Sequence, residues 1–183
     1  MLGMKKRVLE TRKLTVLALL IAVIVVFTRF FSYETQDLRV SLTFIPEALM
    51  AMLFGPFWSG IGSAIADGVG VILFPKTGGY FPGFTLNAFI AGAIYGFFYY
   101  KKELTWFRVI MATLLVTIIN HFILTPLWLS LMYGIDLSII GWWIPRIIKN
   151  VIFFPIQVVG TYYIGAKLPY KQLLSKLTPV HNK

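Results

Sequence analysis

Four ionisable residues interrupt apolar stretches of this sequence: Glu47, Asp67, Arg146 and Lys149. Carboxylates accept hydrogen bonds and bases bind anions, so these residue types point to recognition of a polar ligand. A charged side chain at the centre of a bilayer costs about 2.5–3.5 kcal/mol on insertion scales, so four of them facing lipid would be prohibitive. If the apolar stretches cross a membrane, we expect most of these side chains to line a bundle interior or an aqueous cavity.

The two bases favour an anionic ligand. Arg146 and Lys149 stand one helical turn apart, where like charges repel each other unless an anion lies between them. Bases also outnumber the nearby acids. A carboxylate would neutralise this excess and accept hydrogen bonds from both side chains.

Polar and aromatic residues recur at steps of three and four in four apolar stretches, which places each set on one helix face. The sets are Ser59, Ser63, Asp67 and Gly70; Phe84, Asn87, Ala91 and Tyr95; Thr113, Thr117, Asn120, His121, Leu124 and Trp128; and Arg146, Lys149, Asn150, Phe153 and Gln157. Four such faces predict one shared polar cavity. Serine and threonine also hold membrane helices together, and we favour that role for Ser59, Ser63, Thr113 and Thr117. His121 fits an interhelical hydrogen bond and a ligand contact equally well.

Aromatic residues gather near one predicted membrane interface. They are Phe44, Phe74, Tyr80, Phe81, Phe84, Trp142 and Trp143. An aromatic belt at the lipid headgroups explains many of them. Tyr80 and Phe81, on a predicted loop, could instead stack on a flat ring.

The composition requires a membrane. Of 183 residues, 58% are hydrophobic and only 13% are charged, whereas in soluble domains about a quarter of all residues are charged. A net charge of +10 might suggest nucleic acid, but a nucleic-acid binder needs a soluble surface. The sequence has no cysteine, which excludes disulfides and thiol chemistry.

The length permits about six helical spans in one all-α membrane domain, 1–183, with a short second span. We place the spans at 14–31, 44–54, 57–74, 83–100, 106–132 and 142–168, with a break at Gly55-Pro56. The loop Ser32–Thr43 alternates enough to form a short hairpin. Together with Pro75–Pro82, it is predicted to gate a cavity in the outer half of the membrane.

Twelve bases then fall on one side of the membrane: Lys5, Lys6, Arg7, Arg12, Lys13, Lys101, Lys102, Arg108, Lys167, Lys171, Lys176 and Lys183. Basic loops face the cytoplasm, so we predict that both termini are cytoplasmic. The other five bases are Arg29, Arg39, Lys76, Arg146 and Lys149, and they lie in or beyond the outer half, against that rule.

Motifs for catalysis and for energy supply are missing. The sequence contains no GxxxxGK[ST], HExxH or GxSxG, and Glu47 and Asp67 have no evident catalytic partner. We therefore expect no enzyme, no cofactor, no metal and no nucleic-acid partner. A small intramembrane enzyme and a purely structural membrane protein remain as alternatives.

Several segments resemble the substrate-binding S components of energy-coupling factor (ECF) vitamin transporters. They are Phe44–Pro56, Gly60–Gly70, Phe81–Thr85 and Gly92–Gly96, with an Ala18-xxx-Ala22 face on the first span. The sequence looks most like the folate-specific members. The resemblance implies a non-catalytic importer subunit in a prokaryotic plasma membrane. It also implies a membrane-embedded coupling protein, docked on Ala18 and Ala22, and two cytoplasmic ATPase subunits.

Folate suits these residues. Asp67 could accept two hydrogen bonds from the pterin ring, Asn87 could read the adjacent edge, and aromatic rings could stack on it. The glutamate tail would meet Arg146, Lys149 or Arg39. Riboflavin, thiamin and pantothenate are the alternative vitamins, and the first two bring less negative charge. The predicted substrate contacts are Arg39, Phe44, Glu47, Asp67, Phe81, Phe84, Asn87, Tyr95, His121, Trp142, Arg146, Lys149 and Asn150.

Overall fold

The computed structural model describes residues 2–34, 39–75 and 80–167, with side chains for 10–32, 41–75 and 80–167. The helical elements are α1 (Leu2–Phe30), α2 (Phe44–Leu73), α3 (Pro82–Tyr99), α4 (Trp106–Val116), the π-helix η1 (Thr117–Leu124), α5 (Thr125–Tyr133) and α6 (Ile140–Lys167). Two short strands, β1 (Ser32–Glu34) and β2 (Arg39–Ser41), follow α1. The tips of both predicted gating loops, 35–38 and 76–79, lie outside the described residues.

Four stretches are long and apolar enough to cross a membrane: Glu10–Phe30, Phe44–Leu73, Trp106–Tyr133 and Ile140–Lys167. The last combines the length of a bilayer span with a mostly exposed apolar surface, as expected where lipid replaces water. The chain is therefore a helical multi-pass membrane protein. The number of crossings and the side that each terminus faces stay predictions.

The break predicted between the second and third spans is confirmed, although both halves belong to α2. Gly55 has φ +80° and ψ −177°, a backbone conformation that only glycine adopts easily. Pro56 follows it and lacks the amide hydrogen that would continue the helical hydrogen bonds. Gly55 and Pro56 therefore produce this kink themselves. The predicted spans 44–54 and 57–74 lie on its two sides.

The second half of α2 packs on α3 with almost no side chain between the two backbones. A Cβ atom at Gly96 would lie 2.4 Å from Pro56 Cα, and one at Gly92 would lie 2.5 Å from the Ser59 carbonyl oxygen. The Ser59 hydroxyl also lies 2.6 Å from the carbonyl oxygen of Gly92, to which it donates. Small residues allow this close approach, as is usual between membrane helices.

These contacts give opposite expectations for two glycines. Gly96→Ala should lower the free energy of unfolding by about 1–3 kcal/mol, because backbone atoms of α2 cannot move aside cheaply. Gly68→Ala, on the same pair of helices, meets nothing within 4 Å and should be neutral or stabilising. Thermal unfolding in detergent measures both. Equal melting temperatures for the two variants would contradict the described packing.

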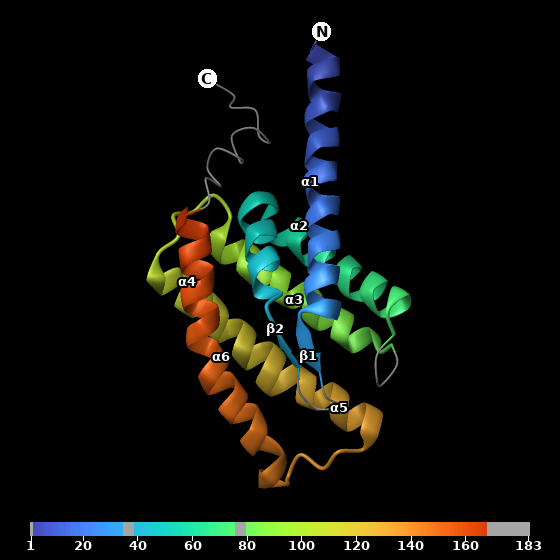
Figure 1. Cartoon of the computed structure of the whole chain (residues 1–183), viewed down its shortest axis with the longest axis vertical. Coiled ribbons are helices and arrows are strands. Elements are labelled where there is room, and N and C mark those ends of the chain that lie inside the picture. Colours follow the sequence, from blue (N-terminus) through green and yellow to red (C-terminus); the bar gives the residue numbers. More distant parts are fainter. Residues whose placement is uncertain (1, 35–38, 76–79, 168–183) are drawn as a thin grey trace.

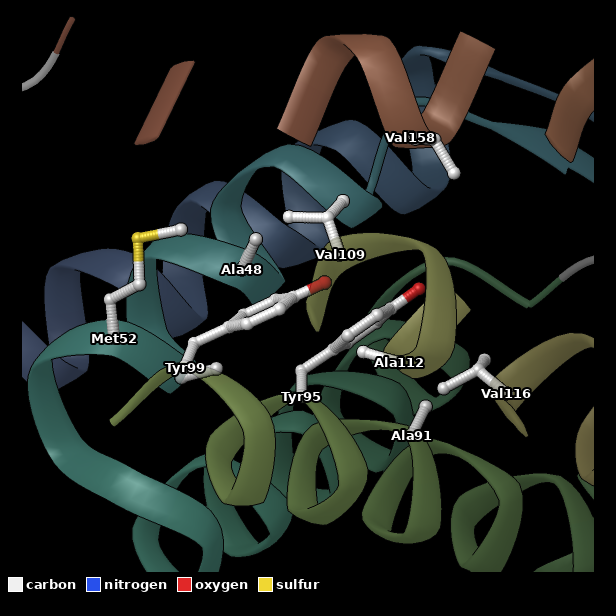
Figure 2. Packing of buried hydrophobic residues seen from close by; sticks show 10 residues of the cluster. Ala48, Met52, Ala91, Tyr95, Tyr99, Val109, Ala112, Val116 and Val158 are labelled. Carbon is white, nitrogen blue, oxygen red and sulfur yellow. The ribbon is translucent and has the colours of Figure 1, made fainter. Parts of the chain in front are cut away.

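A buried cluster joins α2, α3, α4 and α6. It contains Ala48, Ala51, Met52, Ala91, Tyr95, Tyr99, Val109, Ala112, Val116 and Val158. Figure 2 shows the rings of Tyr95 and Tyr99 side by side within it, with centroids 5.6 Å apart and planes inclined by 18°. This cluster fixes α3 relative to the helices that carry the polar residues.

The predicted hairpin in 32–43 is confirmed. β1 and β2 pair antiparallel with Ser32 opposite Ser41. The Ser32 hydroxyl donates to the carbonyl oxygen of Thr28, so the hairpin is attached to the end of α1. In Figure 1 the hairpin and the α5–α6 connection lie toward one end of the molecule, whereas the start of α1, the α3–α4 turn and the end of α6 lie toward the other.

Candidate functional site

Hydrogen bonds converge on Asn87, a buried residue of α3. Its Nδ2 donates to Thr125 Oγ1 at 3.1 Å, and its Oδ1 accepts from Trp128 Nε1 at 2.9 Å. Its backbone carbonyl oxygen accepts from Asn120 Nδ2 at 2.9 Å. Asn87 thus ties α3 to η1 and α5, and both ends of its amide group already have protein partners.

Aromatic rings surround this network. Phe81 lies 5.7 Å from Trp128 and 6.0 Å from Phe84, measured between ring centroids. Gly83 makes room for them, because a Cβ atom there would lie 2.5 Å from Phe81 and 2.6 Å from Trp128. The bond to Asn87 fixes the Trp128 indole, which provides a flat apolar surface beside polar groups.

Asp67 faces the start of α3 from α2. Its Oδ2 accepts a hydrogen bond from Thr85 Oγ1 at 2.9 Å. A carboxylate has about four acceptor positions, so the threonine orients the group and leaves capacity for further donors. We call Asp67, Phe81, Phe84, Thr85, Asn87, Asn120, Thr125 and Trp128 the amide–aromatic cluster.

The π-helix η1 carries the next part of the site. The amide of Thr125 donates to the carbonyl oxygen of Asn120, five residues earlier, which is the π pattern. Pro126 cannot donate a backbone hydrogen bond, so it weakens regular α-helical pairing at this point. Asn120 is buried and His121 is half-buried here. Such widened turns often occur at functional sites.

A second group, which we call the cation–aromatic cluster, joins η1 to α6 and contains Phe122, Trp142, Trp143 and Arg146. The guanidinium carbon of Arg146 lies 3.7 Å from the Trp142 ring centroid, and Arg146 is only 4% exposed. Trp142 lies edge-on to Trp143, whose ring is parallel to that of Phe122 at 6.5 Å. Cation–π contact stabilises the buried charge.

Donors predominate in the cation–aromatic cluster and at Lys149, one turn further along α6. Trp142 Nε1 is buried and has no hydrogen-bond partner among the described residues. Lys149 is half-buried on the same helix, next to the buried Asn150. An indole N–H, a guanidinium and an ammonium can only donate, so an acceptor such as a carboxylate is the complementary ligand group.

Other predicted site residues lie elsewhere. Tyr95 belongs to the hydrophobic core rather than to either cluster. Phe44 is buried at the start of α2, with its ring beside Gly160 of α6, and Glu47 is half-buried one turn later. Arg39 belongs to β2, and its side chain lies outside the described residues.

The predicted docking residues Ala18 and Ala22 are both exposed on α1. They stand one helical turn apart, so they share one face and leave it flat. This placement is compatible with helix docking.

Six members of the two clusters were not among the predicted substrate contacts: Thr85, Asn120, Phe122, Thr125, Trp128 and Trp143. Trp128 was visible in sequence, because it follows Asn120, His121 and Leu124 at helical spacing. The two threonines had no distinguishing signal, since threonine also serves helix packing.

The amide–aromatic and cation–aromatic clusters place hydrogen-bonding groups beside aromatic rings in a helical membrane protein, which suits a polar, partly aromatic ligand. Comparisons with known proteins specify the class. Residues 12–165 match the family model for the substrate-specific component of ECF transporters. Because this match covers most of the chain, the protein belongs to that family. It is therefore a transport subunit and not an enzyme, as the sequence motifs predicted.

The chain is also similar to individual members of this family. The folate transporter FolT of Clostridium novyi is 35% identical over 161 residues, covering 88% of this chain and 92% of the relative. FolT of Leuconostoc mesenteroides is 38% identical over 160 residues, covering 85% of each. A crystal structure of FolT bound with folic acid is 67% identical, with a TM-score of 0.83, and covers 87% of this chain and 94% of that chain.

Proposed function

We propose that this chain binds folate as the substrate-specific component of an ECF importer. The observation that carries the proposal is its 67% identity and TM-score of 0.83 to FolT bound with folic acid. The polarity of the two clusters supports it. Asp67 provides acceptors for the N–H groups of a pterin, and Phe81, Phe84 and Trp128 provide rings that can stack on it.

The cation–aromatic cluster and the nearby Lys149 support recognition of the glutamate tail. Arg146, Lys149 and the Trp142 indole N–H are donors, and a glutamate brings two carboxylates that accept. η1 connects the two clusters, because Asn120 contacts α3 and Phe122 contacts α6 through Trp143. One elongated ligand with donors at one end and carboxylates at the other matches this arrangement.

The same proposal includes the membrane and the partners. We place the chain in a prokaryotic plasma membrane with six crossings and both termini in the cytoplasm. The basic α3–α4 turn and the end of α6 lie toward one end of the molecule in support of this orientation. The exposed Ala18–Ala22 face would dock on a membrane-embedded coupling protein, and two ATPase subunits would supply the energy for release inside.

Ligand released from the purified protein tests the choice of vitamin. The chain would be expressed in cells, purified in detergent and denatured, and the ultraviolet–visible spectrum of the supernatant recorded. A pterin chromophore is expected. A flavin spectrum would instead support the riboflavin alternative and overturn the folate proposal.

A further inference from the structure

The side-chain oxygen of Asn120 is a buried hydrogen-bond acceptor. Asn120 is only 6% exposed, and its Nδ2 donates to the Asn87 carbonyl oxygen. Its Oδ1 is buried and has no hydrogen-bond partner in the part of the chain that the structure describes. An unpaired buried acceptor destabilises a protein, and more so where no water can reach it.

The chemistry of the neighbours fixes which end of the Asn120 amide is unpaired. A backbone carbonyl oxygen can only accept, so Nδ2 must face Asn87 and Oδ1 must point away. Asn87 is fixed in the same way, because the Trp128 indole N–H can only donate and must therefore meet Asn87 Oδ1. Asn87 Nδ2 then donates to Thr125.

This pattern separates the roles of the two asparagines. Both amide ends of Asn87 are occupied by protein groups, so this side chain holds Trp128 and α5 in place. Asn120 uses one end for α3 and keeps an acceptor, and it lies within the π-helical segment η1. π-helical segments occur frequently at functional sites, and a buried acceptor without a donor in one of them favours a ligand contact.

A pterin carries hydrogen-bond donors that would meet these acceptors. Its amide–amino edge offers one ring N–H and the two N–H bonds of an amino group. Asp67 accepting in bidentate fashion takes the ring N–H and one amino N–H, which leaves the second amino N–H for another acceptor. Asn120 Oδ1 is an acceptor of the amide–aromatic cluster that no described protein group uses.

We propose that Asn120 Oδ1 accepts the second N–H of the pterin 2-amino group, and that Asn87 is a positioning residue for Asn120 and Trp128. This inference rests on the proposed folate function. From the sequence, Asn87 was predicted to contact this edge of the pterin; the proposal assigns that contact to Asn120 instead.

A ligand pair tests the proposal on the full-length protein in detergent. Folic acid and 2-desaminofolic acid, which lacks the amino group, would be titrated into the parent protein and into Asn120→Ala. The variant should bind folic acid about 10- to 100-fold more weakly. It should bind the desamino compound within about threefold of the parent, because that ligand has no amino N–H to lose.

Two results would overturn the proposal: an equal loss of affinity for both ligands, or unchanged binding of folic acid. Asn120→Leu, similar in size, replaces the alanine variant if that variant folds poorly. Thr113→Val is the matched control, because Thr113 is buried in α4 outside both clusters and its substitution should leave both affinities unchanged. A parent protein that does not bind folic acid would instead refute the proposed function itself.

Discussion

Asp67→Ala is expected to weaken folic acid binding by about 100- to 1,000-fold, because it removes two charge-assisted hydrogen bonds to the pterin. Thr85 orients the carboxylate through its bond to Oδ2, so the acceptors are already in place when the ligand arrives. A preorganised acceptor loses little entropy on binding. Calorimetric titration of the detergent-purified variant measures the change.

Two further variants separate recognition from general charge effects. Thr85→Val removes the orienting bond and should cost less than Asp67→Ala, since the carboxylate itself remains. Asp136→Asn is the control, because Asp136 is exposed before α6, where its Oδ1 accepts from the Ser138 amide at 2.9 Å. If Asp67→Ala bound folic acid as well as the parent protein, the assignment of Asp67 to the pterin would be wrong.

Arg146→Gln should weaken binding of folic acid by about 10- to 100-fold, through loss of a charged donor for the glutamate tail. The loss should nearly vanish for pteroic acid, which keeps the pterin but lacks the glutamate. Arg146→Lys should restore binding only in part, because an ammonium lacks the planar face that stacks on Trp142. Titration of each variant with both ligands provides the measurement.

The control for Arg146 is Arg108→Gln. Arg108 lies near the start of α4, where its guanidinium donates to the Glu103 carbonyl oxygen, outside both clusters. The Arg108→Gln variant should bind folic acid with the affinity of the parent protein. Equal losses of folic acid and pteroic acid affinity in Arg146→Gln would show that Arg146 supports the fold rather than the tail.

Local chemistry made some features predictable. Gly55-Pro56 favours a helix break and alternation in 32–43 favours paired strands, so both features were predicted from sequence. The π-helix was not predicted, because its hydrogen bonds differ from those of an α-helix by one residue and no side-chain period reveals that shift.

Helical spacing predicted which residues share a helix face, but not which neighbours each residue contacts. Asn87 and Tyr95 share one face of α3, yet Asn87 meets η1 and α5, whereas Tyr95 lies two turns away in the apolar core. Periodicity cannot distinguish these positions, because it records direction around a helix and not the neighbour that a residue meets. The roles of Asn120 and Trp128 likewise depend on partners from distant segments.

Equilibrium titration of the detergent-purified chain with folic acid tests the central claim most directly. We predict saturable binding of one folic acid per chain, with a Kd below about 1 µM, equivalent to a binding free energy of about −8 kcal/mol or better. Riboflavin and thiamin should not compete. Absence of saturable folic acid binding by folded protein, or its displacement by either of those vitamins at similar concentration, would contradict the account.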